Sequence, residues 1–309
     1  MSQVKPLPED IQKVAIEELG EVPSRIPADL EALKEWIRIQ PHLRARMDDQ
    51  FLIQFLRGSK YSLEKAKEKV DLYFSLKSKY PNMFSPCNVD DPKFRQMHNL
   101  GCYVLLPKPL NGNGCRICVG RFSYSPDNLN IEDIYPPTCA MFEITFLTDP
   151  HASIHGFVFV FDFGECTASH LLQFTPTFCK KVISFLEKSM PCRIRAAYFI
   201  NVPSVAQQIL RVIFTLCSEK LRQRLFIIGN NINDLTKYIP LEYLPKDYGG
   251  NNGSLNELIK EYNKTFDSFR EYFKENAQYG TDESLRIGKP IDLDGPFGMG
   301  GSFRKLAVD

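Results

Sequence analysis

The sequence of 309 residues has almost no net charge and no apolar stretch long enough to cross a bilayer. With a formal net charge of +1, no overall field attracts nucleic acid, so any charged partner must meet a local patch. The longest nearly apolar run, residues 156–163, is far shorter than the roughly 20 residues of a membrane-spanning helix, and it contains Asp162. We therefore expect neither nucleic-acid binding nor a transmembrane segment.

The motifs of common cofactor-binding and hydrolytic sites are also missing. The chain has no Walker A or dinucleotide fingerprint, no HExxH helix and no GxSxG elbow. Cys115 and Cys118 have the spacing of a zinc pair, but no second pair of ligands follows, which favours two ordinary strand cysteines. Asp162, Ser169 and His170 could suggest a triad, yet adjacent serine and histidine side chains rarely face each other. We expect a structural carboxylate at Asp162, a capping or packing histidine, and no catalytic residue, metal or cofactor.

The cysteine content indicates a reducing compartment. Nine cysteines are spread from Cys87 to Cys217, and residues 1–20 are polar and acidic, unlike a signal peptide. An odd number of cysteines without that leader indicates free thiols. We expect a cytoplasmic protein that meets membranes only at their surface.

Helical periodicity dominates the first ninety residues. Residues 29–40 and 48–57 place apolar side chains three and four positions apart, and Ser62 can cap a third helix. A proline-containing stretch at 81–86 ends the block. These patterns predict a small helical N-terminal domain over residues 1–90.

Strands then alternate with helices. The segments near 131–147, 171–189 and 204–224 have helical length and separate the later apolar runs. The strand-like runs are 102–106, 117–122, 157–163, 196–200 and 225–228. This alternation predicts an α/β domain over 91–253, with a mainly parallel sheet covered by helices. A charged helix near 255–273 and a glycine-rich tail make up the remaining segment, 254–309.

The segment 204–221 is apolar around more than one face of a helix, so both of its sides need an apolar neighbour. It could be sandwiched between the sheet and another domain, or it could be a movable lid over a lipid. Seven cations and one acid lie between Lys188 and Arg224. A solvated face explains such a run, but cations beside an apolar helix also suit an anionic membrane surface, at about 1 kcal/mol each.

Five ordered motifs resemble the CRAL-TRIO lipid-binding family, over roughly residues 11–255. They are Asp49-Gln-Phe-Leu-Ile-Gln-Phe-Leu-Arg57, Gly156-Phe-Val-Phe-Val-Phe-Asp162, Ile200-Asn-Val-Pro203, Glu219-Lys-Leu-Arg-Gln-Arg224 and Leu244-Pro-Lys-Asp-Tyr-Gly-Gly250. The resemblance is closest to the branch of tocopherol and retinaldehyde carriers, and residues 301–305 are similar to the ends of its insect members. It implies a helical N-terminal domain, an α/β domain whose sheet floors a lipid cavity, and a mobile lid helix.

The resemblance also implies site residues, matched position by position. The cavity wall would comprise Tyr135, Thr138, Phe142, Phe161, Leu172, Phe174, Val182, Phe185, Leu186 and Ala197. The lid would add Ile209, Val212 and Ile213. A basic cleft for phosphoinositide headgroups would comprise Arg193, Arg195, Lys220 and Arg224. The branch usually has one more basic residue where this chain has Ser59, although Lys60 is adjacent.

The implied cavity differs from that of the tocopherol carrier. Ala168 and Leu172 stand where that carrier has two phenylalanines, while Phe142, Phe174 and Phe185 replace smaller side chains. Because a packed wall responds to a single methylene, the shape of the ligand should differ.

We therefore expect a monomeric intracellular carrier that binds one tocopherol-, retinoid- or similar isoprenoid-like lipid and releases it at phosphoinositide-containing membranes. A lipid-sensing regulatory adaptor without bulk transfer is the alternative, suggested by the charged region 257–283. An enzyme acting on a lipid is a third hypothesis, which the missing nucleophile and cofactor motifs oppose.

Overall fold

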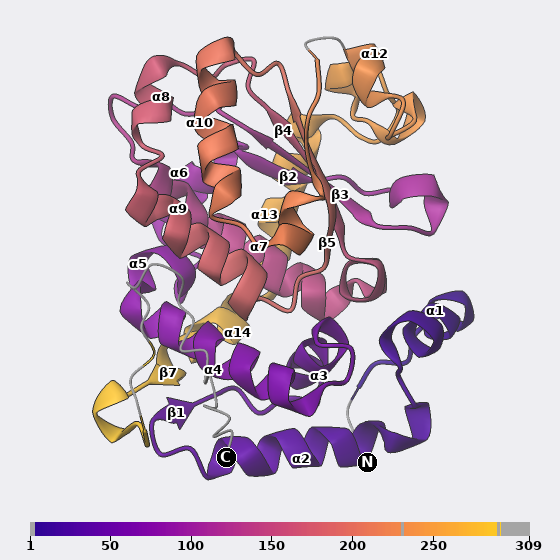
Figure 1. Ribbon diagram of the computed structural model, residues 1–309, viewed down its shortest axis with the longest axis vertical. Helices are drawn as coiled ribbons and strands as arrows, with labels where there is room; N and C mark the ends of the chain where they lie inside the picture. The colour runs from indigo at the N-terminus through magenta and orange to yellow at the C-terminus, as the bar shows by residue number, and fades with distance from the viewer. Residues whose placement is uncertain (1–3, 230–231, 289–290, 292–309) are drawn as a thin grey trace, which may run out of the picture.

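The computed structural model describes residues 4–229, 232–288 and 291, and the expected glycine-rich tail with residues 301–305 lies outside that part. Its N-terminal third is helical, as periodicity predicts (Figure 1). The helices are α1 (Glu9–Leu19), α2 (Ile26–Arg38), α3 (Asp49–Gly58), α4 (Leu63–Lys79), α5 (Pro81–Phe84) and α6 (Pro92–Asn99). Leu33, Leu52 and Val70 are fully buried where α2, α3 and α4 meet, in an apolar cluster that continues into the α/β part.

A five-stranded sheet in the order β2-β3-β4-β5-β6 forms the centre of the molecule. Its strands are β2 (Tyr103–Leu105), β3 (Arg116–Arg121), β4 (Phe157–Asp162), β5 (Ile194–Ile200) and β6 (Leu225–Ile227). Only β2 runs antiparallel to its neighbour, and the other pairs are parallel. The predicted α/β fold with a mainly parallel sheet is confirmed. A separate two-stranded sheet pairs β1 (Leu43–Arg44) with β7 (Gly280–Thr281).

Side chains alternate strictly between the two faces of the sheet. On β4, Phe157, Phe159 and Phe161 pack into one apolar cluster, while Val158 and Val160 pack into another. The phenylalanine face is covered by α7 (Tyr135–Thr148), α8 (Ala168–Leu172), α9 (Pro176–Ile183) and α10 (Ser204–Thr215). The valine face is covered by α12 (Ile232–Leu235) and α13 (Leu255–Ser268). Figure 1 shows α8, α9 and α10 to the left of the sheet, with the N-terminal helices below it.

Two of the expected long helices are interrupted. The segment 171–189 breaks before Thr175, whose side chain caps α9, and Pro176 occupies the first turn of that helix. Beyond α9 a π-helical turn continues over Ser184–Ser189. The segment 204–224 breaks after Thr215, because Ser218 caps a separate short helix, α11 (Glu219–Arg222).

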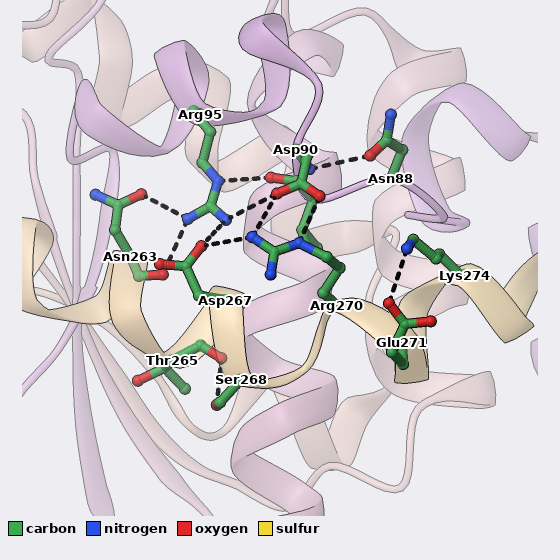
Figure 2. Close-up of polar contacts among 11 residues, drawn as sticks. Asn88, Asp90, Arg95, Asn263, Thr265, Asp267, Ser268, Arg270, Glu271 and Lys274 are labelled. Carbon is green, nitrogen blue, oxygen red and sulfur yellow. Dashed lines mark hydrogen bonds and ion pairs between the residues drawn. The ribbon is translucent and has the colours of Figure 1, made fainter.

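Ion pairs and hydrogen bonds join the C-terminal helices α13 and α14 (Arg270–Glu275) to α6 and the residues just before it (Figure 2). Arg95 donates to Asp267 at 2.6 Å, and Arg270 donates to both oxygens of Asp90. Arg95 also reaches the backbone oxygen of Asn263 at 2.9 Å. This network joins residues about 170 positions apart in the sequence.

A buried ion pair connects the helical block to the α/β part. Lys77 of α4 lies 3.0 Å from the Glu143 carboxylate of α7, and both side chains are almost fully buried. Tyr73 and Tyr272 donate to the same carboxylate at 2.9 and 2.8 Å. Burial raises the pKa of Glu143, but the charge of Lys77 and these hydrogen bonds outweigh it and hold that pKa below its usual value.

Candidate functional site

An apolar cavity of about 200 Å³ lies between the phenylalanine face of the sheet and helices α7, α9 and α10. Phenylalanines pave its floor: Phe159 stacks on Phe161 at 5.7 Å, and Phe161 stacks on Phe199 of β5 at 5.0 Å between ring centroids. Gly120 of β3 makes room for this floor, since a Cβ there would lie 2.7 Å from the Phe161 ring. The roof comes from side chains of α9, the π-helical turn and α10.

Ten of the thirteen expected wall residues line this cavity. They are Tyr135, Thr138, Phe142, Phe161, Phe174, Val182, Phe185, Leu186, Ala197 and Ile213. The strand alternation brings Phe161 and Ala197 to one face, and the helical period does the same for Tyr135, Thr138 and Phe142. These residues come from five separate segments between residues 135 and 213.

Three expected wall residues lie elsewhere, which corrects the position-by-position assignment. Leu172 at the end of α8 is 80% exposed and Val212 of α10 is 67% exposed. Ile209 is half-buried and does not reach the cavity. For Val212 the reason is its position around the helix. Leu210 and Ile213 of α10 face the cavity, and Val212 therefore lies on the opposite side of the helix.

The exposed side of α10 also decides between two interpretations of this helix. Val205 and Val212 face solvent, while Ala206 and Leu210 are buried against the α/β core. The helix is therefore a one-sided cover over the cavity and is not sandwiched between two apolar layers.

Several wall residues were missed at the sequence level. They include Tyr103, Phe122, Phe163, Phe178 and Phe199. The alternation of side chains along a strand predicts Phe163 and Phe199 as wall residues. Phe163 lies two residues after Phe161, and Phe199 lies two residues after Ala197. No comparable pattern marks Tyr103, because β2 has only three residues.

Two of the polar groups on the wall are already used within the protein. The Thr138 hydroxyl donates to the Ile134 carbonyl at 2.7 Å, one helical turn earlier. The Tyr124 hydroxyl donates to Gln173 at 2.9 Å. Neither hydroxyl has a proton left to donate to a ligand.

Three thiols also face the cavity, from Cys139, Cys179 and Cys217. Burial raises the pKa of Cys179 to about 11, and burial together with the nearby Glu187 raises that of Cys217 to about 11. Burial raises the pKa of Cys139 further. All three are therefore neutral thiols at physiological pH.

The four expected cleft residues gather at the start of β5 and around α11. Arg193 and Arg195 both donate to one oxygen of Glu18 in α1, at 3.0 and 2.6 Å. Arg224 donates to the Ile194 carbonyl, which holds it beside the same strand. These guanidinium groups are positioned by backbone carbonyls and by a carboxylate from a distant helix.

Unbalanced positive charge remains at this cleft. Partial burial lowers the pKa of Lys220, and the charges of Arg224, Lys60, Arg193 and Lys65 lower it further. Lys60 thus stands beside the cleft, next to the position where the family resemblance implied a missing cation. Arg57 does not take part, since its side chain is buried against Glu21. An anion entering the cleft would relieve this mutual repulsion.

Asp162 and His170, two of the residues considered above as a possible catalytic triad, have structural contacts. Asp162 accepts hydrogen bonds from Gly164, Asn201 and Tyr248 at 2.8–2.9 Å, so it fastens the end of β4. His170 accepts from the backbone of Thr167 in a capping box and contacts the Tyr124 carbonyl with its other nitrogen. Within the described ranges, no group of side chains could hold a metal ion and no helix is long and apolar enough to span a membrane.

Comparison with known proteins matches two family models, the CRAL/TRIO domain over residues 104–250 and the Pinta-like UBA domain over residues 22–94. The human alpha-tocopherol transfer protein-like protein is 30% identical over 251 residues, which are 81% of this chain and 72% of that protein. Human clavesin-2 is 28% identical over 79% of this chain and 74% of its own length. The crystal structure of Sfh5 has the same fold, with a TM-score of 0.51 and 13% identity over 87% of this chain and 99% of that one.

Proposed function

Because the chain belongs to the CRAL/TRIO domain family of lipid-binding and lipid-transfer proteins, we propose that it carries one hydrophobic lipid and releases it at phosphoinositide-containing membranes. The observation that carries this proposal is the apolar cavity floored by stacked phenylalanines. Each methylene moved from water into such a cavity contributes about 0.8 kcal/mol, so an isoprenoid tail binds tightly without elaborate polar contacts.

The same tight binding makes spontaneous release slow, so release requires the cover to move. Helix α10 covers the cavity with one face and exposes Val205 and Val212 on the other, and α8 exposes Leu172. Apolar side chains on an outer face stabilise contact with the acyl boundary of a bilayer. A membrane that binds the open form better than the closed form shifts the population toward the open form.

The basic cleft supplies the attraction to that membrane. Arg193, Arg195, Lys220 and Arg224 lie together with Lys60. Partial burial lowers the pKa of Lys220, and the charges of Arg224, Lys60 and Arg193 lower it further. Arginine forks bind phosphate oxygens in pairs, which favours phosphorylated inositol headgroups over a diffuse anionic surface. These features support delivery at the membrane surface, a process that requires no catalytic step.

The regulatory adaptor remains the alternative, and its sequence hint is weakened by the structure. In the charged C-terminal region, Asp267 and Arg270 pair with Arg95 and Asp90 of the same chain, and Glu271 pairs with Lys274 (Figure 2). These charged side chains are therefore paired within the same chain. A pull-down whose partner changes with lipid loading would favour the adaptor.

Native mass spectrometry of the protein purified from its own tissue tests the proposal, followed by organic extraction of what is bound. One stoichiometric isoprenoid or retinoid would support the carrier and identify its cargo. An empty protein, or one with mixed phospholipids at low occupancy, would favour the adaptor.

A further inference from the structure

Two tyrosine hydroxyls form a polar point in the otherwise apolar cavity. Tyr103 comes from β2 and Tyr135 from the first residue of α7, and their ring centroids are 6.5 Å apart. The two hydroxyls lie close enough for each to affect the pKa of the other. Within the described residues, no hydrogen bond joins either hydroxyl to another protein group. Gly120 lies beside both rings, because a Cβ at that position would be 2.7 Å from the Phe161 ring and 3.4 Å from the Tyr103 ring.

This pair differs from the hydrogen-bonded tyrosines of the described chain. Six tyrosine hydroxyls donate to a carboxylate, an amide or a backbone carbonyl. They are Tyr61 to Glu21, Tyr73 to Glu143, Tyr124 to Gln173, Tyr248 to Asp162, Tyr262 to Met141 and Tyr272 to Glu143. Neither Tyr103 nor Tyr135 has such an acceptor among the described residues. Buried hydroxyls are normally satisfied, so an unused one beside a cavity indicates a partner that enters the cavity.

Counting protons shows what that partner must offer. Two hydroxyls hold two protons, and burial raises the pKa of both groups, so both are protonated at physiological pH. At most one of these protons can be donated within the pair. At least one is therefore left for an acceptor oxygen in the cavity.

The remaining wall excludes a charged ligand end. Thr138 and Tyr124 have already donated their protons to Ile134 and Gln173. Arg121 borders the cavity, but it alternates with Gly120 along β3, so its side chain is on the other face of the sheet, where it donates to the Gly101 carbonyl at 3.0 Å. A carboxylate or phosphate inside would therefore lose its hydration without gaining a counter-charge.

We propose that the pair of Tyr103 and Tyr135 selects a neutral lipid that presents a hydrogen-bond-accepting oxygen, such as a hydroxyl or carbonyl, at the end of the cavity between β2 and α7. This inference rests on the proposed carrier function and specifies its cargo class. It excludes pure hydrocarbons, which leave a tyrosine proton unpaired, and ionised lipids, which meet no cation.

The test uses three C20 compounds that share one branched skeleton. Phytol has a hydroxyl, phytane has no oxygen and phytanic acid has a carboxylate. The delipidated full-length chain is incubated with equimolar amounts presented in phosphatidylcholine vesicles, and the bound compounds are quantified by native mass spectrometry. We expect phytol to be preferred over phytane by roughly two- to tenfold, the range of one net hydrogen bond, and over phytanic acid as well.

Variants assign the preference to specific hydroxyls. Tyr103→Phe combined with Tyr135→Phe should bring the ratio of bound phytol to phytane close to one, and each single variant should lower it less, since one hydroxyl remains. The matched control is Tyr262→Phe, which removes a tyrosine hydroxyl outside this cavity that donates to the Met141 carbonyl at 3.1 Å. That control should leave the ratio unchanged, and the melting temperature of each variant verifies folding.

The outcomes separate this inference from the carrier function. If the wild-type chain binds phytol and phytane equally, or if the double variant keeps the full preference, the selection by the tyrosine pair is wrong and the carrier function stands. If the wild-type chain takes up none of the three lipids, both are wrong.

Discussion

Glu18 and Arg195 are 177 positions apart in the sequence and are joined by a hydrogen bond of 2.6 Å from the guanidinium Nη2 to the carboxylate Oε2. The same oxygen also accepts from Arg193. Hydrogen bonds from these arginines outweigh partial burial and hold the pKa of Glu18 below its usual value. Helix α1 thus places a carboxylate on two of the cations proposed to bind a headgroup, where it competes with phosphate.

Removing that carboxylate should strengthen membrane binding. We expect Glu18→Gln to bind phosphatidylinositol bisphosphate vesicles roughly two- to tenfold more tightly than the wild type in a flotation assay, because two guanidinium groups become available. The control is Glu17→Gln, which removes the same charge at an exposed neighbouring position paired only with Lys13. Equal effects of the two variants would mean that net charge, and not competition at the arginines, is responsible.

Removing two of the cations of the cleft should weaken membrane binding. At about 1 kcal/mol for each cation near an anionic surface, Lys220→Ala combined with Arg224→Ala should weaken binding to the same vesicles roughly 30-fold. The loss should shrink as salt is added. A double variant of two exposed lysines on α13, Lys260→Ala with Lys264→Ala, changes the net charge equally and should bind like the wild type. Binding that survives in the first double variant would contradict the proposed cleft.

The exposed apolar side chains of the cover should matter for transfer and not for cargo affinity. Leu172→Asp and Val212→Asp place charges on the outer faces of α8 and α10, away from the cavity. We expect lipid transfer between vesicles to slow several-fold while the bound fraction at equilibrium is unchanged. Ile39→Asp is the control, since Ile39 is 70% exposed on the helical block. A matching decrease in cargo affinity would place these residues at the cavity after all.

The buried pair of Lys77 and Glu143 should be sensitive to the loss of one partner. Lys77→Met leaves the carboxylate without its counter-charge, and we expect the free energy of unfolding in urea to fall by about 3–5 kcal/mol. Lys274→Met breaks the exposed pair with Glu271 and should cost less than about 1 kcal/mol. Similar losses for both variants would show that the buried pair contributes no more than a surface pair.

Lys69 should make stability depend on alkaline pH. Its ammonium donates to the carbonyls of Glu187 and Met190, and burial lowers its pKa to about 8. The unfolded chain therefore binds more protons than the folded chain between pH 8 and about 10.5, so this group raises stability as pH increases through that window. The gain is on the order of 3 kcal/mol. The difference between the wild type and Lys69→Met in urea midpoints should grow in favour of the wild type across the window, and a constant difference would refute the lowered pKa.

The sequence was sufficient for features that depend on local periodicity. The alternation along 157–163 predicts which phenylalanines share a face, and the proline at 203 marks where α10 begins. The ordered motifs identify the family, which the comparisons confirm. The 3.6-residue period of a helix also predicts that Val212 lies on the opposite side of α10 from Leu210. Val212 was expected at the cavity only because it matches a family position, and in the structure it faces solvent.

Features that depend on long-range contacts were not predictable in this way. Glu18 reaches Arg193 across 175 positions, and no local pattern distinguishes it from the neighbouring Glu17. Tyr103 lies in a strand of three residues, and its significance depends on the hydroxyl of Tyr135 and on which acceptors are absent nearby. Such relationships appear only once the chain is folded.

The thiols on the cavity wall have a consequence for the chemistry of the cargo. Cysteine attacks conjugated carbonyls and aldehydes as a thiolate, and with a pKa of about 11 only about one in 10,000 molecules of Cys179 or Cys217 is ionised at pH 7. Cys139, with a higher pKa, is less reactive still. The small thiolate fraction therefore slows addition to electrophiles, which favours storage of an unsaturated aldehyde or quinone beside these three sulfur atoms.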